Sequence, residues 1–417
     1  MSNRSSFFPM IIIGVLFFIF GFVTWLNGSL IPFLKIICDL SDFQALFVTF
    51  AFYIAYTVMA FPMSFVLDKT GYKNGMAIGL GIMAVGALLF IPAAFSGEFI
   101  VFLLALFTLG TGLTILQTAS NPYVVHIGPI ESAAMRISIM GLINKSAGIL
   151  VPMLFTALIL SDIKIGDSFT QGDIDALASR LIVPYIIMAA VLIGLIALVK
   201  FSSLPELEFE KSGDIEAKSI FQFPHLIMGV IALFFYVGIE VIAGDTIGLY
   251  AQSLHVKNFT SLTSYTMVFM VLGYIIGVLF IPKYLSQQKA LLGSSIAGIL
   301  LILGVVFSSS ESYIVSEFLW GWSGVATLPD TITFVALLGI ANALVWPTIW
   351  PLALKGLGRY TAQGSALLIM AIAGGAILPL VFGKVADITS LQDAYLVGIV
   401  CYLFIFYYAI RGHKKRR

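Results

Sequence analysis

The sequence PELEFEKSGDIEAK, from Pro205 to Lys218, decides the architecture of this chain. Half of its residues are charged, whereas six apolar runs lie on each side of it, each long enough to cross a bilayer. A hydrocarbon core of about 30 Å needs roughly 20 helical residues. Backbone polar groups inside that core must be satisfied within each segment, so helices are expected. We therefore predict an all-α membrane protein with twelve transmembrane helices in two six-helix halves.

The predicted boundaries place an N-terminal half at residues 1–201, a cytoplasmic linker at 202–220 and a C-terminal half at 221–417. The spans expected in the first half are Phe8 to Leu34, Phe43 to Leu67, Gly75 to Ala94, Phe99 to Val125, Ile137 to Leu160 and Leu181 to Val199. The spans expected in the second half are Phe221 to Tyr250, Tyr265 to Ile281, Ala290 to Phe307, Ile332 to Leu354, Ala366 to Phe382 and Tyr395 to Ile410.

Composition excludes several classes of protein. With 60% hydrophobic and only 10% charged residues, the chain has too little polar surface for a water-soluble globule, so lipid is its expected solvent. The net charge of +1 says nothing about nucleic acid, but no soluble domain is long enough to carry a known nucleic-acid-binding module, so we exclude that class. The sequence has no nucleotide-binding loop, HExxH or GxSxG motif, and Cys38 and Cys401 form no metal-binding pattern. We expect neither enzymatic activity nor a cofactor.

Charge distribution predicts the topology. Placing the N-terminus in the cytoplasm puts about sixteen of the 22 Lys and Arg residues on the cytoplasmic side, so both termini are expected there. The basic C-terminal tail is interpreted as a topology anchor, with a lipid-specific or regulatory site as the alternative.

Two pairs of segments indicate an internal repeat. Asn121-Pro122 followed by Ala147 to Pro152 corresponds to Trp350-Pro351 followed by Gly374 to Pro379, and Phe17 to Gly21 corresponds to Phe234 to Gly238. Six helices used twice in parallel are the major facilitator design, in which substrate binds near the midplane between the halves. The turn Asp68 to Lys73 after the second span resembles the charged turn of that superfamily.

Three ionisable residues lie within predicted spans, where a charge costs about 2.5–3.5 kcal/mol at a helix centre. They are Lys145 in the fifth span and Glu240 and Asp245 in the seventh. The two carboxylates are five residues apart, or roughly 140 degrees around a helix, so they cannot face one point. We predict a substrate or coupling role for these groups. The alternative is a structural pair between Lys145 and one carboxylate.

Amide side chains form a second group on the first half: Asn27, Gln117, Asn121 and Asn144. Amides offer both donors and acceptors, which suits an uncharged, hydroxyl-rich ligand. Interhelical hydrogen bonding is the alternative.

Trp346 and Trp350 are four residues apart on the tenth span, with Asn342 expected one turn earlier on the same face. Indole rings beside an amide suit a sugar. An interfacial aromatic belt or ordinary packing remains open.

Over nearly its full length the chain resembles the fucose, galactose and glucose symporter family of the major facilitator superfamily. Thr24 to Pro32, which includes Trp25, is similar to the family's N-L-N-D-I-L-x-P signature, and Leu116 to Tyr123 is similar to L-E/Q-x-A-A-N-P-[FY]. Asn144 matches the Asn of A-Q-x-F-N-S. The resemblance implies a sugar-binding role for these residues and a bacterial inner-membrane location.

Three departures from the family pattern affect the implied mechanism. Gly28 and Gln117 stand where fucose-transporting members have the Asp and Glu implied in sugar and proton handling, and Lys145 replaces a Ser. The Gln favours a glucose- or galactose-type hexose over fucose. Because the implied proton route is absent, Na⁺ is slightly favoured over H⁺ as the coupling ion, bound near Asp245 or Glu240. A second hypothesis makes Lys145 itself the cation.

The sequence thus predicts a secondary active transporter that couples cation movement to hexose uptake by alternating access. Its expected partners are a hexose, the coupling cation and the lipid bilayer, and it is expected to work as a monomer. An exporter of amphipathic compounds is the first alternative. A non-transporting membrane receptor or scaffold is the second.

Overall fold

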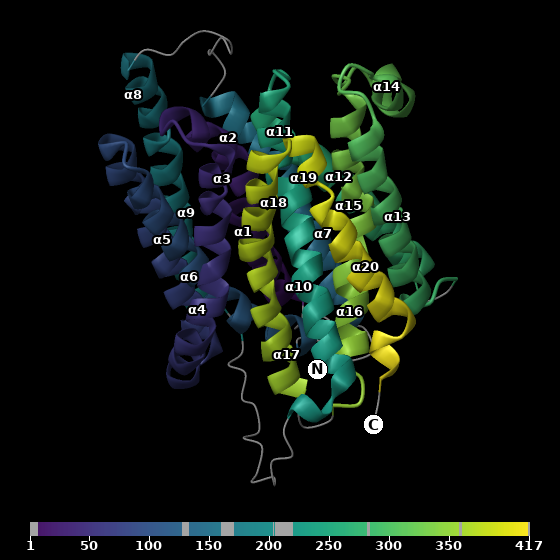
Figure 1. Ribbon diagram of the computed structural model, residues 1–417. Coiled ribbons are helices and arrows are strands. Elements are labelled where there is room, and N and C mark those ends of the chain that lie inside the picture. The colour runs from purple at the N-terminus through teal and green to yellow at the C-terminus, as the bar shows by residue number, and fades with distance from the viewer. Residues whose placement is uncertain are drawn as a thin grey trace. The chain divides into compact units, whose positions relative to one another are not determined.

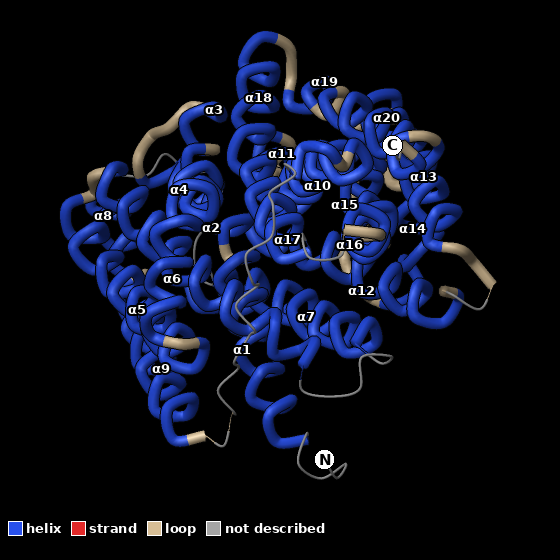
Figure 2. The backbone as a smooth tube through the Cα atoms, turned by 90° about the horizontal axis from the view of Figure 1, so that it is seen from below, coloured by secondary structure: helices blue, strands red, loops and turns tan. Residues whose placement is uncertain are grey.

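The computed structural model describes residues 7–126, 133–159, 171–202, 204, 220–281, 284–357 and 361–415. Within these ranges the regular elements are helices, and no strand is present (Figure 2). The described residues include twelve helices that are long and apolar enough to cross a membrane. The predicted all-α class is therefore confirmed.

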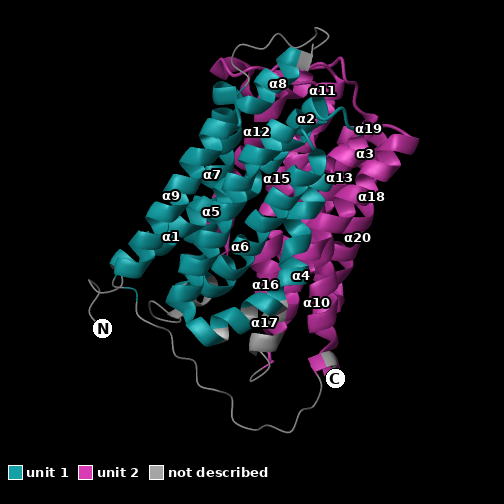
Figure 3. Cartoon of the chain, turned by 90° about the vertical axis from the view of Figure 1, so that its left-hand side faces the viewer, with its two compact units in different colours: residues 1–41, 47–211 teal, residues 42–46, 212–417 magenta. Residues whose placement is uncertain are grey.

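The chain divides into two compact units (Figure 3). The first unit comprises residues 1–41 and 47–211, and the second comprises residues 42–46 and 212–417. The division between 211 and 212 falls within the predicted linker 202–220. Most of that linker, residues 203 and 205–219, lies outside the described residues.

The helices of the first unit follow the predicted spans, and one further short helix, α8, precedes the sixth span. They are α1 (Phe7–Trp25), α2 (Asn27–Ile37), α4 (Phe47–Thr70), α5 (Tyr72–Ser96), α6 (Phe99–His126), α7 (Ala133–Ile159), α8 (Gln171–Ser179) and α9 (Ile182–Phe201).

The second unit contains twelve helices in its described part, several of them pieces of one span. They are α3 (Asp42–Ala45), α10 (Pro224–Asp245), α11 (Ile247–Ser253), α12 (Thr263–Phe280), α13 (Gln287–Phe307), α14 (Ile314–Trp320), α15 (Asp330–Ala343), α16 (Val345–Leu354), α17 (Thr361–Met370), α18 (Gly374–Ile388), α19 (Leu391–Ala394) and α20 (Val397–Ile410).

The same packing pattern occurs in both units. In the first unit α5 packs against α6 and α9, α4 packs against α6, and α1 packs against α7. In the second unit α13 packs against α15 and α20, α12 packs against α15, and α10 lies beside α18 (Figure 1). Counted as spans, these are the same four pairs in each unit, which supports the six-helix repeat.

One helix crossing in each unit depends on a glycine. A Cβ added at Gly21 of α1 would overlap the carbonyl oxygen of Asn144 on α7. A Cβ added at Gly374 of α18 would overlap the carbonyl oxygen of Phe234 on α10 in the same way. Small residues allow helix backbones to approach closely where no hydrophobic effect drives association. The second of these glycines belongs to the stretch of small residues from Ala371 to Ala376.

Several of the twelve spans contain a short interruption that the sequence analysis did not predict. The first span breaks at Leu26 between α1 and α2, the seventh at Thr246 between α10 and α11, and the tenth at Leu344 between α15 and α16. The eleventh changes to a 3₁₀ turn at Ala371–Ala373. Interrupted helices inside a membrane are tolerated where neighbouring protein groups satisfy the freed backbone. These breaks lie close to the predicted functional residues.

The charged turn after the second span is tight. It passes through Gly71, whose φ of 78° favours glycine, between the end of α4 and the start of α5. The Lys73 amine donates a hydrogen bond of 2.8 Å to the carbonyl oxygen of Ser202 at the end of α9. A cation at a helix C-terminus satisfies free carbonyls and complements the helix dipole.

Candidate functional site

The break in the first span brings three predicted residues together in the first unit. Trp25 is the last residue of α1, and its indole N–H donates to Oδ1 of Asn144 on α7 at 3.4 Å. The Asn144 amide N–H₂ donates to the carbonyl oxygen of Phe17 at 3.4 Å. The Lys145 amine lies 4.2 Å from the centroid of the Trp25 ring. Both Trp25 and Lys145 are buried.

This arrangement combines one strong contact with two weak ones. An ammonium group over an indole face gains up to about 2 kcal/mol when the pair is desolvated. Hydrogen bonds of 3.4 Å are at the long end of the useful range and contribute little. The Asn144 amide could therefore exchange its present partners for a ligand hydroxyl at small cost, while Lys145 and Trp25 hold one another in place.

Gln117 and Asn27 lie on other helices of the first unit. The Gln117 amide, on α6, donates a hydrogen bond of 2.9 Å to the hydroxyl of Tyr56 on α4. Asn27 begins α2 and is buried, and its amide makes no hydrogen bond within the described part of the chain. Asn121 is placed in α6, but its side chain lies outside the described residues. Tyr56 is a contact that sequence reasoning missed.

The predicted tryptophan pair forms a stack in the second unit. The rings of Trp346 and Trp350 on α16 lie 5.3 Å apart at 24°, and Tyr236 of α10 lies 6.3 Å from Trp346. Trp346 and Trp350 remain half-buried. The result is an aromatic surface with one exposed side, which is the kind of group that the C–H face of a sugar ring packs against.

Asn342 was expected on the same face as Trp346, and the structure corrects this expectation. The helix breaks at Leu344, between the two residues, so the helical spacing used in the prediction does not hold. The fully buried Asn342 instead accepts a hydrogen bond of 2.8 Å at Oδ1 from the Tyr402 hydroxyl on α20. Its Nδ2 makes no hydrogen bond with described residues. Asn342 is therefore held by α20 and, unlike the two half-buried tryptophans, is not exposed.

Glu240 lies among tyrosines that the sequence analysis did not single out. It is 7% exposed and hydrogen-bonds the hydroxyl of Tyr236, one helical turn earlier on α10. Tyr274 of α12 and Tyr402 are close enough to interact with its charge. The one available sequence signal was the four-residue spacing of Tyr236 and Glu240. The group forms a buried carboxylate surrounded by phenolic hydroxyls.

Asp245 lies apart from this group, at the break in the seventh span. It is fully buried and is the last residue of α10. The hydroxyl of the next residue, Thr246, shares a 2.9 Å hydrogen bond with Tyr395, and the Thr263 hydroxyl donates to the Gly244 carbonyl oxygen at 2.7 Å. No group of three or more His, Cys, Asp or Glu suited to a metal occurs among the described residues. A Na⁺ ion here would depend on Asp245 with carbonyl and hydroxyl oxygens.

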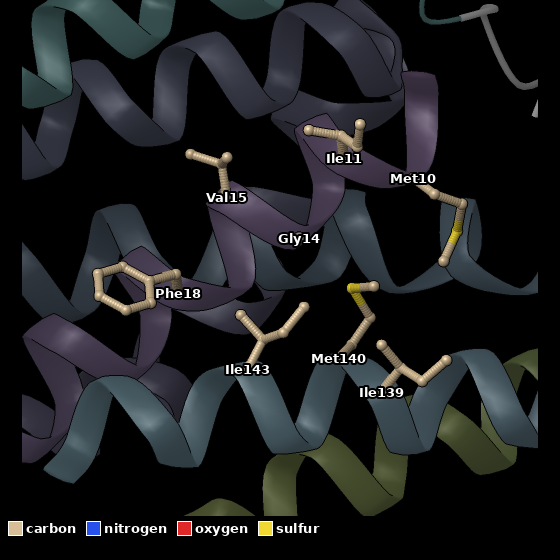
Figure 4. Close-up of a pocket in the computed structure, with 8 residues that line it drawn as sticks. All are labelled: Met10, Ile11, Gly14, Val15, Phe18, Ile139, Met140 and Ile143. Atoms are coloured by element: carbon tan, nitrogen blue, oxygen red, sulfur yellow. The ribbon is translucent and has the colours of Figure 1, made fainter. Parts of the chain in front are cut away.

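The apolar fissures of the two units are unsuited to a sugar. A fissure of about 460 Å³ between α1 and α7 in the first unit has an entirely apolar lining (Figure 4). Its lining residues are Met10, Ile11, Gly14, Val15, Phe18, Ile139, Met140 and Ile143. A second fissure of about 400 Å³ lies between α10 and the start of the eleventh span. Neither offers the hydrogen-bonding side chains that a sugar requires.

Comparison with known proteins identifies the relatives of this chain. The sequence profile of the Major Facilitator Superfamily matches residues 13–380. The glucose/galactose transporter of Brucella abortus biovar 1 (strain 9-941) is 32% identical, over 99% of this chain and 96% of the relative. The L-fucose-proton symporter of Escherichia coli (strain K12) is 28% identical, over 98% of this chain and 93% of the relative. The crystal structure of the transporter FucP in the outward conformation superposes with a TM-score of 0.72 at 26% identity, covering 97% of this chain and 99% of that one.

Proposed function

Because the chain belongs to the Major Facilitator Superfamily, a family of transporters rather than enzymes, we propose that it takes up a neutral hexose of the glucose or galactose type together with a cation. The observation that carries this proposal is the set of amide and aromatic groups on the membrane helices of both units. Amides recognise hydroxyl groups without requiring charge, and indole rings pack against the apolar face of a sugar.

Each unit, taken by itself, carries groups that we propose for sugar recognition. In the first unit, Asn144 and Gln117 hydrogen-bond hydroxyl groups and Trp25 supports the ring, with Lys145 held by the indole. Asn27 and Asn121 are further contacts proposed from the family motifs. In the second unit, Trp346 and Trp350 form the stacking surface, and Asn342 acts through Tyr402.

The coupling cation is assigned to α10. Glu240, with its tyrosine hydroxyls, suits a proton that is bound and released. Asp245, at the helix break, suits Na⁺ with added carbonyl oxygens. The sequence-based preference for Na⁺ rested on the lack of carboxylates at Gly28 and Gln117. The fucose-transporting relatives are named as proton symporters and give that preference no support. We therefore propose one cation bound on α10, H⁺ or Na⁺.

The proposed cycle is alternating access in the bacterial inner membrane, with both termini cytoplasmic and a single chain sufficient. In a symporter each ligand raises the affinity of the other by the same factor. The alternative of an exporter of amphipathic compounds finds no support among the sugar-transporting relatives. It would also leave the amide groups of the first unit without a role.

Calorimetric titration of the purified protein with glucose and galactose tests this proposal. We expect the sugar dissociation constant to fall as the concentration of the coupling cation increases. The Na⁺ concentration and the pH are varied separately. Glu240→Gln should retain sugar binding and abolish its pH dependence if the cation is H⁺. Asp245→Asn should abolish its Na⁺ dependence if the cation is Na⁺. Glu317→Gln, a change at an exposed carboxylate on α14, is the matched control. A sugar dissociation constant that depends on neither the Na⁺ concentration nor the pH would refute cation coupling.

A further inference from the structure

The segment between α13 and α15 presents large apolar side chains to the outside and buries a serine. It contains α14 and the 3₁₀ turn Gly321–Ser323, and it lies outside the candidate membrane spans. Phe318 is 83% exposed and Trp322 is 84% exposed, whereas Ser316 is completely buried. This is the reverse of the pattern expected for a helix on a surface that faces water.

Three exposed apolar residues of this segment, Ile314, Phe318 and Trp322, are called the apolar stripe. Ile314 and Phe318 are one turn apart on α14 and share a helical face, whereas Trp322 lies in the 3₁₀ turn that follows Trp320, whose backbone angles are not helical. Ile314 is also strongly exposed. A contiguous exposed apolar patch of this kind marks a surface that contacts a protein or a membrane.

The opposite side of the segment is fixed to the second unit by hydrogen bonds. The Ser316 hydroxyl donates to the Leu328 carbonyl oxygen at 2.7 Å, and the Trp320 indole N–H donates to the Ala326 carbonyl oxygen at 3.0 Å. The Asp330 carboxylate, at the start of α15, accepts from the Val315 backbone N–H at 2.8 Å. The outward orientation of the apolar stripe is therefore built into the fold and is not a product of a loose loop.

Packing of Trp320 adds to this anchoring. Its ring lies 5.8 Å from that of Tyr265 and 5.9 Å from that of Phe269, both on α12. The segment thus joins the ends of α12, α13 and α15 on one side of the second unit, as Figure 1 shows for α14. A partner that binds the apolar stripe would therefore also restrain the ends of these three helices.

We propose that α14 and its 3₁₀ turn form an interfacial anchor, with Ile314, Phe318 and Trp322 inserted at the boundary between lipid headgroups and acyl chains. Continuity with the lipid-facing surface supports lipid as the partner, because Phe307, at the end of α13, is 81% exposed. Tryptophan is also enriched at this depth in membrane proteins. With both termini cytoplasmic, as the charge distribution predicts, the anchored leaflet is the outer one.

Charge selects the kind of lipid. The chain has no Lys or Arg between Lys289 and Lys355, whereas Glu311 and Glu317 are exposed in this segment. Basic residues near a membrane surface attract anionic lipids, and this segment has none. The anchor is therefore suited to zwitterionic lipids such as phosphatidylcholine, and it is held by apolar insertion alone.

Quenching of Trp322 fluorescence in phosphatidylcholine vesicles tests the anchor independently of transport. The chain has five tryptophans, so the Trp322 signal is taken as the difference between the unmodified protein and Trp322→Phe. We expect nitroxide groups near the headgroup to quench this difference several-fold more than nitroxide groups near the bilayer centre or iodide in water. Trp320→Phe is the control, because the Trp320 ring is packed against α12 and should be quenched less.

A second variant keeps the result decisive. Replacing Ile314 and Phe318 by Ser removes the apolar stripe from an exposed surface without changing a buried contact. Trp322 should then become accessible to iodide. Iodide quenching of Trp322 in the unmodified protein would overturn the proposal. Protection that depends on the protein-to-lipid ratio would also overturn it, because it would indicate a second copy of the chain as the partner.

Discussion

The contact between Lys145 and Trp25 gives the sharpest prediction about the proposed sugar site. Lys145→Met removes the charge and keeps an apolar side chain, and Trp25→Leu removes the ring. In the structure the Lys145 amine lies 4.2 Å from the ring centroid, and both residues are buried. If the two side chains act as one unit in sugar binding, the two substitutions should not be additive.

The expected coupling follows from the burial of the pair. Cation–π contacts contribute about 0.5–1 kcal/mol when exposed and about 2 kcal/mol when desolvated. We therefore expect a coupling free energy of about 1–2 kcal/mol between Lys145 and Trp25. Since about 1.4 kcal/mol corresponds to a tenfold change in affinity, this is about a 5- to 30-fold departure from additivity in the sugar dissociation constant.

The assay is a double-mutant cycle with the sugar dissociation constant measured by calorimetry for all four proteins. The double variant should bind sugar more tightly than the product of the single effects predicts. Trp320→Leu combined with Lys145→Met is the control pair. Their effects on the sugar dissociation constant should be additive, because Trp320 lies on α14 in the second unit and packs against α12. Additivity of Lys145→Met and Trp25→Leu to within about 0.5 kcal/mol would refute the reasoning.

Three further predictions follow from packing, hydrogen bonding and titration. Gly21→Ala should lower the thermal stability of the protein and its sugar uptake, because the added Cβ meets the α7 backbone; the expected loss in the free energy of unfolding is about 1–3 kcal/mol. Gly14→Ala is the control and should be tolerated, because its Cβ meets a flexible side chain at 3.4 Å. Tyr402→Phe should lower the free energy of unfolding by about 1–3 kcal/mol, because it leaves the side-chain carbonyl oxygen of Asn342 without a donor. Adding Asn342→Leu should recover part of the lost thermal stability. A greater loss in the double variant would contradict this reasoning. Burial, and to a lesser extent the nearby Glu98 charge, raises the pKa of Cys38 to about 11, so about a thousandth of the thiol is ionised at pH 8. The alkylation rate of Cys38 should therefore rise about tenfold per pH unit up to that pKa. A rate that reaches a plateau below about pH 9 would contradict the raised pKa.

The sequence allowed the broad architecture to be predicted because hydrophobic length and charge distribution act over whole spans. The spacing of Glu240 and Asp245 predicts that they lie on different sides of the seventh span. Apolar patterns contain no signal for a short interruption, however, and the breaks at Leu26 and Thr246 were missed. At the second break the Thr246 hydroxyl shares a hydrogen bond with Tyr395, a contact that residue patterns along one span do not reveal.

The tyrosines of the candidate site show the same limit. Tyr402 is one aromatic residue in an aromatic-rich helix, and its relation to Glu240 arises from the packing of α10 against α20. Tyr236 lies on α10 with Glu240, and the four-residue spacing of the two was the one available signal. The position of Asn342 was predicted from an unbroken helix, so the break at Leu344 made that inference wrong. The buried serine of α14 and the exposed tryptophan of the following 3₁₀ turn became meaningful only when solvent exposure was known.

The most direct test of the central claim is uptake of labelled glucose and galactose by proteoliposomes that contain only this protein, with proton and Na⁺ gradients imposed separately. We predict that one of the two gradients drives accumulation above the external concentration. Glu240→Gln or Asp245→Asn, according to the ion, should abolish accumulation while exchange of sugar across the membrane continues. Absence of both accumulation and exchange for either sugar under both gradients would contradict the account.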